Sequence, residues 1–143
     1  MSISAVILPV LVQVGLTLLL LLWMGRTRVG HLRRGEVQVK DIVLGERNWP
    51  ARVTQIQNSY HNQFELPVLF YVLVALALIT RKADMLFVVM SWVFVVSRLA
   101  HAAIHTTSNK LAWRFQAFVI GVLVLAAMWT IFGIRIFSAE AGV

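Results

Sequence analysis

Long stretches with almost no charged side chains constrain the fold of this chain more than any other feature. The stretches that carry at most one charged residue cover positions 1–25, 53–80, 85–97 and 115–134. A lipid hydrocarbon core about 30 Å thick requires roughly 20 residues of apolar helix. The pattern predicts an all-α integral membrane protein, a bundle of four transmembrane helices at about 3–24, 50–80, 84–106 and 111–136.

The composition excludes a water-soluble globule. Hydrophobic residues make up 59% of the 143 positions and charged residues only 13%, whereas soluble domains contain about 25% charged residues. The length allows one domain over residues 1–143. The chain has no cysteine, which excludes a disulfide framework, a thiolate metal site and a cysteine nucleophile.

The basic residues predict the orientation in the membrane. Ten of the 13 Lys and Arg residues belong to the side of the long loop 25–49 and the short loop 106–110, and three belong to the other side. The positive-inside rule then places both loops in the cytoplasm and both termini outside. The net charge of +7 is explained by this topology and by anionic lipid headgroups, so no nucleic-acid partner is expected.

Several polar side chains nevertheless fall within the predicted spans, where they are costly and indicate function. In helix 50–80 they are spaced i, i+4, i+7, and in helix 84–106 they are spaced i, i+3, i+7, so each set predicts one helix face. The residues are Asn58, Asn62 and Glu65, then Arg98, His101 and His105, with Arg114 opening the last helix. We expect a polar cluster open toward the cytoplasm.

This cluster has three interpretations. Arginine forks bind carboxylates, so the cluster would suit a small zwitterionic ligand with several carboxylates. Alternatively, Glu65 and Arg98 form an intramembrane ion pair that fixes helix register, with Asn62 as an interhelical hydrogen-bonding group. A metal site could use His61, Glu65, His101 and His105, but histidines four residues apart are a weak signal and no metal is expected.

Three motifs, in order along the chain, resemble those of one membrane-protein family. The run Asn62-Gln-Phe-Glu65-Leu-Pro67 follows Arg47 and Arg52, and Ser97-Arg98-Leu-Ala-His101-Ala-Ala-Ile-His105 resembles an R-x-x-H-x-x-x-Y pattern. Arg114 matches a further family arginine. Together they resemble the MAPEG family, the membrane-associated proteins in eicosanoid and glutathione metabolism, over about residues 46–137. The similarity is to bacterial-type members, which implies the bacterial inner membrane.

The resemblance implies a homotrimer with glutathione in cytoplasm-facing clefts between subunits. Asn62 and Glu65 would bind the tripeptide backbone, and Arg98 and Arg114 would bind its carboxylates or thiol. His101 would be a neighbouring group, and Arg26 would reach the ligand from the adjoining subunit. The implied activity is that of a glutathione transferase or peroxidase on lipophilic substrates that enter from the membrane. Arg114 is the first choice for stabilising the thiolate and Arg98 the second, with His105 as a hydrogen-bond partner.

The chain departs from the family pattern at three positions. His105 stands where glutathione-using members commonly have tyrosine, Asn58 stands where an arginine is common, and Pro67 falls earlier than in several eicosanoid enzymes. These departures keep open a non-catalytic membrane scaffold or lipid-binding protein with the same fold. A transporter or proton relay has less support, because the charges do not continue across the bilayer.

Overall fold

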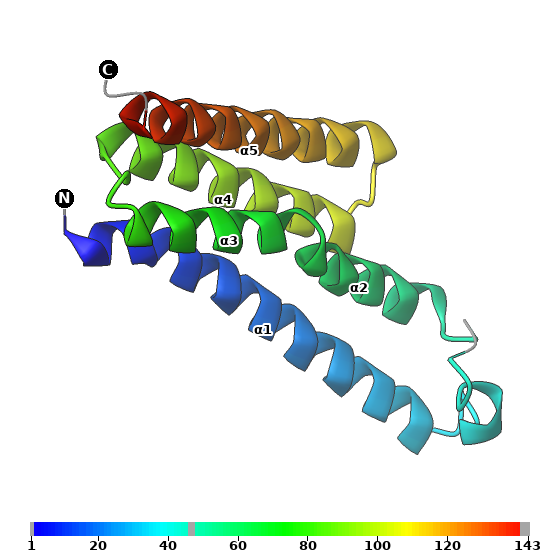
Figure 1. Cartoon of the computed structure of the whole chain (residues 1–143). Helices are drawn as coiled ribbons and strands as arrows, with labels where there is room; N and C mark the ends of the chain where they lie inside the picture. The colour runs from blue at the N-terminus through cyan, green and yellow to red at the C-terminus, as the bar shows by residue number, and fades with distance from the viewer. Residues whose placement is uncertain (1, 46–47, 141–143) are drawn as a thin grey trace.

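The computed structural model describes residues 2–45 and 48–140 and contains helices joined by turns and loops throughout that part of the chain (Figure 1). Its elements are α1 (Ile3–Arg33), the 3-10 helix η1 (Val39–Asp41), α2 (Ala51–His61), the 3-10 helix η2 (Asn62–Phe64), α3 (Leu66–Ile79), α4 (Met85–Thr106) and α5 (Leu111–Glu140). Four segments are long and apolar enough to cross a membrane: α1, the α2–η2–α3 unit, α4 and the stretch Leu111–Ala139 of α5. The prediction of four spanning helices is confirmed.

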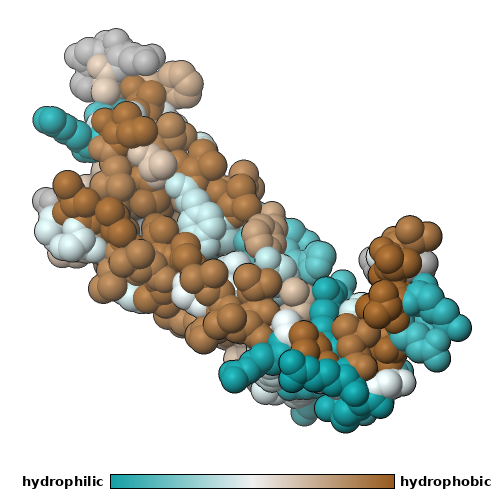
Figure 2. Space-filling view, turned by 90° about the horizontal axis from the view of Figure 1, so that it is seen from below, coloured by the Kyte–Doolittle hydropathy of each residue, from teal (hydrophilic) through white to brown (hydrophobic). Residues whose placement is uncertain are grey.

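The helices run roughly along one axis. Both chain ends and the α3–α4 turn lie at one end of the molecule, whereas η1 and the α4–α5 turn lie toward the other, and α1 diverges from α4 and α5 along its length (Figure 1). Figure 2 shows an apolar surface over the body of the molecule, with hydrophilic residues gathered at the end where α1 finishes. This distribution suits a multi-pass membrane protein.

The first helix is longer than predicted, since it ends at Arg33 and not near residue 24. Gly30, which falls in the predicted loop 25–49, lies inside this helix, and the first glycine with positive φ is Gly35 at +70°. The N–H groups of Gly35 and Glu36 donate to the carbonyls of Leu32 and His31 at 3.0 and 3.1 Å, which is a Schellman ending. At 1.5 Å per residue the helix measures about 47 Å, so its last turns project beyond a bilayer core.

The predicted helix 50–80 is divided where α2 gives way to η2 and α3. Glu65 separates the two parts with φ −98° and ψ −104°, outside the helical region, and Pro67 occupies the first turn of α3. Proline lacks an N–H and its ring clashes with the carbonyl four residues earlier, here that of Gln63. The break therefore lies inside the membrane span, next to the predicted site residues.

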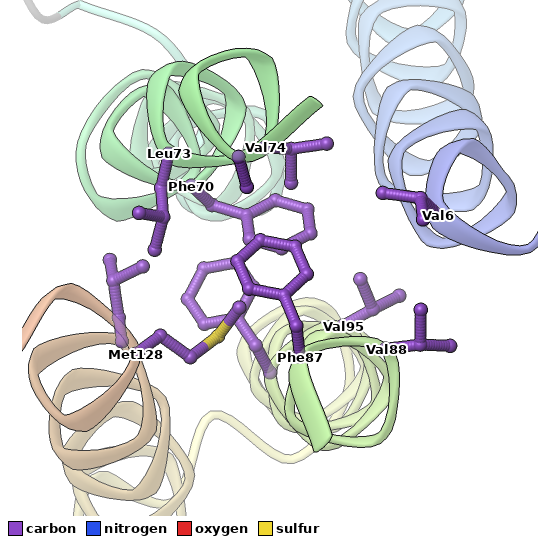
Figure 3. Packing of buried hydrophobic residues seen from close by; sticks show 11 residues of the cluster. Val6, Phe70, Leu73, Val74, Phe87, Val88, Val95 and Met128 are labelled. Atoms are coloured by element: carbon purple, nitrogen blue, oxygen red, sulfur yellow. The ribbon is translucent and has the colours of Figure 1, made fainter. Parts of the chain in front are cut away.

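An apolar core joins all four spanning units near the end that carries the chain termini (Figure 3). The rings of Phe70 and Phe94 stack with centroids 4.7 Å apart. Val6 from α1, Phe87 from α4 and Met128 from α5 close around them, and each is at most 5% exposed. The predicted site residues lie in the other half of the bundle, so the core fixes the helices and leaves that half free for a site.

Candidate functional site

A polar cavity of about 360 Å³ opens between the α2–η2 segment and the α4–α5 region. Six of its lining residues precede or belong to the α2–η2 segment, Glu65 lies at the break that follows it, and the other two come from α4 and α5. They are Trp49, Thr54, Gln57, Asn58, His61, Asn62, Glu65, His105 and Arg114. The structure thus brings together four predicted site residues from two distant parts of the sequence: Asn62 and Glu65, and His105 and Arg114.

The helix break presents Asn62 and Glu65 to this cavity. Asn62 is half-buried and donates from Nδ2 to the carbonyl of Asn58 at 2.8 Å. Glu65 is exposed, and the structure shows no ion-pair partner for its carboxylate among the described residues. The α-helical spacing of Asn58, Asn62 and Glu65 predicts that they share one helix face. In the structure all three line the cavity, although the 3-10 helix η2 interrupts the α-helix between them.

Arg114 reaches the cavity from the first turn of α5. Its side chain is half-buried, and Nη1 donates to Asn109 Oδ1 at 2.5 Å. Asn109 has φ +49° in the α4–α5 turn, a conformation that asparagine adopts more readily than most residues. The turn therefore anchors one side of the guanidinium while the group borders the cavity.

Arg98 lies behind the cavity and not in its lining. Its side chain is fully buried, and Nη2 donates to the carbonyl of Asn62 at 3.2 Å. The guanidinium carbon is 5.9 Å from the ring centroid of Phe118, and Nε and Nη1 have no hydrogen-bond partner. Arg98 therefore joins α4 to the backbone at the break.

Glu65 and Arg98 form no direct ion pair among the described residues, although the charge of Glu65 acts on Arg98. Within residues 2–45 and 48–140, the ion pairs are those of Glu36 with His31 and Arg34, and that of Asp84 with Arg135. Arg98 instead bonds to a main-chain oxygen, because the break in the span brings the Asn62 carbonyl within its reach. Glu65 is left available to a ligand.

The two histidines of α4 have different positions. His105 lines the cavity, whereas His101 is buried one turn earlier, with ring centroids 5.6 Å from His105 and 5.9 Å from Phe118. Nδ1 of each ring is buried and has no hydrogen-bond partner. The described residues contain no group of three or more metal-ligating side chains.

Arg26 is not brought to the cavity in the single chain. It is exposed on α1, within the helix and well before its end. Arg47, quoted in the family resemblance, lies outside the described residues.

Sequence reasoning missed Arg28. Its Nη2 donates to Gln57 Oε1 at 2.6 Å, its guanidinium carbon lies 4.9 Å from the Trp49 ring centroid, and its Nε is buried without a partner. Both partners line the cavity. The expected helix end at residue 24 concealed Arg28, because it placed this residue in a loop and not on the continued α1.

The sequence profile of the MAPEG family matches residues 6–134, which is most of the chain. The chain is a member of the MAPEG family. Searches of curated proteins and of solved structures find no match. The family match and the four apolar helices together make it a MAPEG-family membrane protein with a four-helix transmembrane fold. Its cavity residues Asn62, Glu65, His105 and Arg114 lie within the matched region.

Proposed function

We propose that this MAPEG-family protein is a membrane-embedded glutathione transferase or peroxidase that acts on lipophilic electrophiles. The observation that carries the proposal is the cavity that joins Asn62 and Glu65 to Arg114 and His105. Its lining offers a cation, a carboxylate and amides within one open hollow. A glutathione molecule carries the complementary groups: carboxylates, an ammonium, peptide groups and a thiol.

The positions of these residues support a different role for each of them. Glu65 is unpaired and would accept the ammonium of glutathione, and Asn62 would hydrogen-bond its peptide groups. Arg114 borders the cavity, whereas Arg98 is fully buried behind it. We therefore assign stabilisation of the glutathione thiolate to Arg114. Arg98 would position Asn62 through the hydrogen bond to its carbonyl, and His101 would position His105 through the contact between their rings.

Arg114 would activate the thiol electrostatically. A free thiol with a pKa near 8.5 is mostly protonated at neutral pH, and a neighbouring guanidinium favours the thiolate, which is the reactive nucleophile. In conjugation the thiolate would attack the electrophilic carbon and displace its leaving group. In peroxide reduction it would attack a peroxide oxygen and break the O–O bond, which releases an alcohol after protonation by water and leaves a sulfenic acid that a second glutathione converts to the disulfide and water. His105 would hydrogen-bond the sulfur. Trp113 and Phe115, both exposed beside Arg114 in α5, provide apolar surface for a co-substrate that arrives through the lipid.

The proposal includes a homotrimer with the cavity facing the cytoplasm. The cavity is open, so a neighbouring subunit could cover it and contribute Arg26, which a single chain leaves exposed. The ten basic residues assigned to this side favour the cytoplasmic orientation. Cross-linking of the purified protein followed by mass measurement tests the number of subunits.

A thermal-shift and turnover experiment on the full-length protein tests the function. Glutathione at 100 times its dissociation constant should stabilise the wild type by about 2.7 kcal/mol, and the protein should conjugate glutathione to an aromatic electrophile. Arg114→Ala and Glu65→Ala should lose these effects. Arg33→Ala, which removes an exposed charge outside the cavity, is the matched control and should retain them.

Two results would oppose the proposal. Turnover in Arg114→Ala equal to that of an active wild type would reject the assignment of the thiolate. A folded wild type that neither gains stability from glutathione nor turns it over would favour the non-catalytic scaffold or lipid-binding protein.

A further inference from the structure

Two hollows meet at the end of the molecule that carries the chain termini, far along the helices from the site above. One, of about 460 Å³, is formed by the α3–α4 turn and the C-terminal part of α5, with Lys82, Arg135 and Ser138 in its lining. The other, of about 450 Å³, is formed by α1 and α3 and lined mainly by apolar residues, including Ile3 and Leu78. Arg81 and Ala83 line both hollows.

Some of the charged side chains around this junction form an ion pair and others do not. Arg135 Nη2 donates to Asp84 Oδ2 at 2.6 Å, and Arg135 Nη1 donates to the carbonyl of Lys82 at 3.4 Å. Among the described residues, the side chains of Arg81 and Lys82 have no ion-pair or hydrogen-bond partner. Because Asp84 already neutralises Arg135, the junction retains two unpaired cations.

The backbone that carries these cations is firmly held. The N–H groups of Arg81 and Lys82 donate to the carbonyls of Leu78 and Ala77 at 3.2 and 2.9 Å. This is the same Schellman ending that closes α1, but Arg81 occupies its left-handed position at φ +56° where glycine is usual. The turn therefore fixes the backbone of both residues, with Arg81 lining both hollows and Lys82 lining the hollow beside α5.

The position of the turn matches the depth of lipid headgroups. The adjoining spans end at Ile79 and begin again at Met85, so Arg81 and Lys82 lie just beyond the apolar segments. Val6 and Ala77 form a buried floor for the apolar hollow, and each is at most 2% exposed. A cationic mouth above an apolar groove complements a molecule with an anionic head and a hydrocarbon tail.

We propose that this junction is a binding site for one anionic phospholipid of the surrounding bilayer. The phosphate would lie between Arg81 and Lys82, since a guanidinium binds phosphate with forked hydrogen bonds and an ammonium binds it as a point charge. One acyl chain would pass Ala83 and lie in the groove between α1 and α3. The bound lipid would connect α1, which diverges from α4 and α5, to the α3–α4 turn (Figure 1).

Native mass spectrometry of the detergent-solubilised full-length protein tests the site, with phosphatidylglycerol and phosphatidylcholine as the probes. We expect a first phosphatidylglycerol to bind the wild type more tightly than phosphatidylcholine. Arg81→Gln/Lys82→Gln should weaken that binding by at least about tenfold, since each basic residue near a membrane surface contributes measurably to attraction of anionic lipid. Arg33→Gln/Lys40→Gln removes the same two charges from exposed positions at the other end and should leave the first binding event unchanged.

A second variant separates a phospholipid site from general attraction of anions. Ala83→Phe keeps every charge but fills the passage between the two hollows, and it should weaken phosphatidylglycerol binding while the melting temperature in phosphatidylcholine stays the same. Excess inorganic phosphate should not displace the lipid. Equal loss in the two double variants, unchanged binding in Ala83→Phe, or displacement by inorganic phosphate would each overturn the proposal. None of these readouts depends on glutathione.

Discussion

Gln13 donates from Nε2 to Gln63 Oε1 at 2.9 Å, and both side chains are at most 1% exposed. Gln63 in turn donates from Nε2 to the carbonyl of Ser59 at 2.9 Å. This chain of hydrogen bonds joins the middle of α1 to the 3-10 turn that divides the second span. The neighbouring residues Asn62 and Glu65 line the cavity, so α1 positions the break that presents them.

Replacement of Gln13 by leucine should destabilise the protein by about 1–3 kcal/mol, because it leaves Gln63 Oε1 buried without a donor. Gln13→Leu/Gln63→Leu should cost less than the sum of the two single variants, since it removes both polar partners. Equilibrium unfolding by titration with sodium dodecyl sulfate measures these free energies. Strictly additive losses would show that the two residues are not coupled.

Gly121 determines how closely α4 and α5 approach each other. A Cβ at this position would lie 2.9 Å from Ser97 Oγ, which already donates to the carbonyl of Phe94 at 2.6 Å. Gly121→Ala should therefore cost about 1–3 kcal/mol through overpacking. Gly133→Ala in the same helix, where no atom lies within 4 Å, is the control and should be neutral or stabilising. The same unfolding titration distinguishes them, and equal effects would contradict close packing at Gly121.

The ion pair between Asp84 and Arg135 predicts a pH-dependent contribution to stability. The hydrogen bond from Arg135 lowers the pKa of Asp84 below its ordinary value of 3.8, with a further contribution from the N–H of Phe87. A lowered carboxyl pKa stabilises the fold above the unfolded pKa, and this contribution disappears as the pH falls through the folded pKa. Because Asp84 is well exposed, the contribution should not exceed about 1 kcal/mol.

Asp84→Asn tests this pH dependence, since asparagine retains a helix-capping side chain but loses the charge. The variant should melt at a lower temperature than the wild type at neutral pH. The difference should begin to shrink as the pH falls below about 3.8 and should vanish once the pH is below the lowered pKa of Asp84 in the folded protein. Arg135→Gln should show the same convergence. A difference that persists unchanged in acid would mean that the charge of Asp84 does not contribute.

The number of spans could be predicted because long apolar stretches with few charged residues can satisfy all their backbone polar groups in lipid by forming helices. The end of α1 could not, because the helix continues past Gly25 and Gly30 and is joined to α2 by the contact between Arg28 and Gln57. That contact joins residues distant in the sequence. Local glycine signals indicate turns only where a positive φ is required, as at Gly35.

The polar residues of the site could be predicted as a set, but which of them face the cavity could not. Any polar group in a span requires a partner, which identifies Asn62, Glu65, Arg98 and His105 as residues of interest. Which of them faces the cavity depends on the break at Glu65, where the α-helical phase is lost. Arg98 consequently bonds to a carbonyl and Glu65 remains open.

The ionisation state of bound glutathione shows whether Arg114 stabilises the thiolate. The ultraviolet absorbance of the thiolate, recorded against pH for the protein saturated with glutathione, gives the pKa of the bound thiol. We predict a thiol pKa below the free value of about 8.5 for the wild type and a return toward that value in Arg114→Ala. Absence of a thiolate signal from saturated wild-type protein, or the same titration in Arg114→Ala, would contradict it.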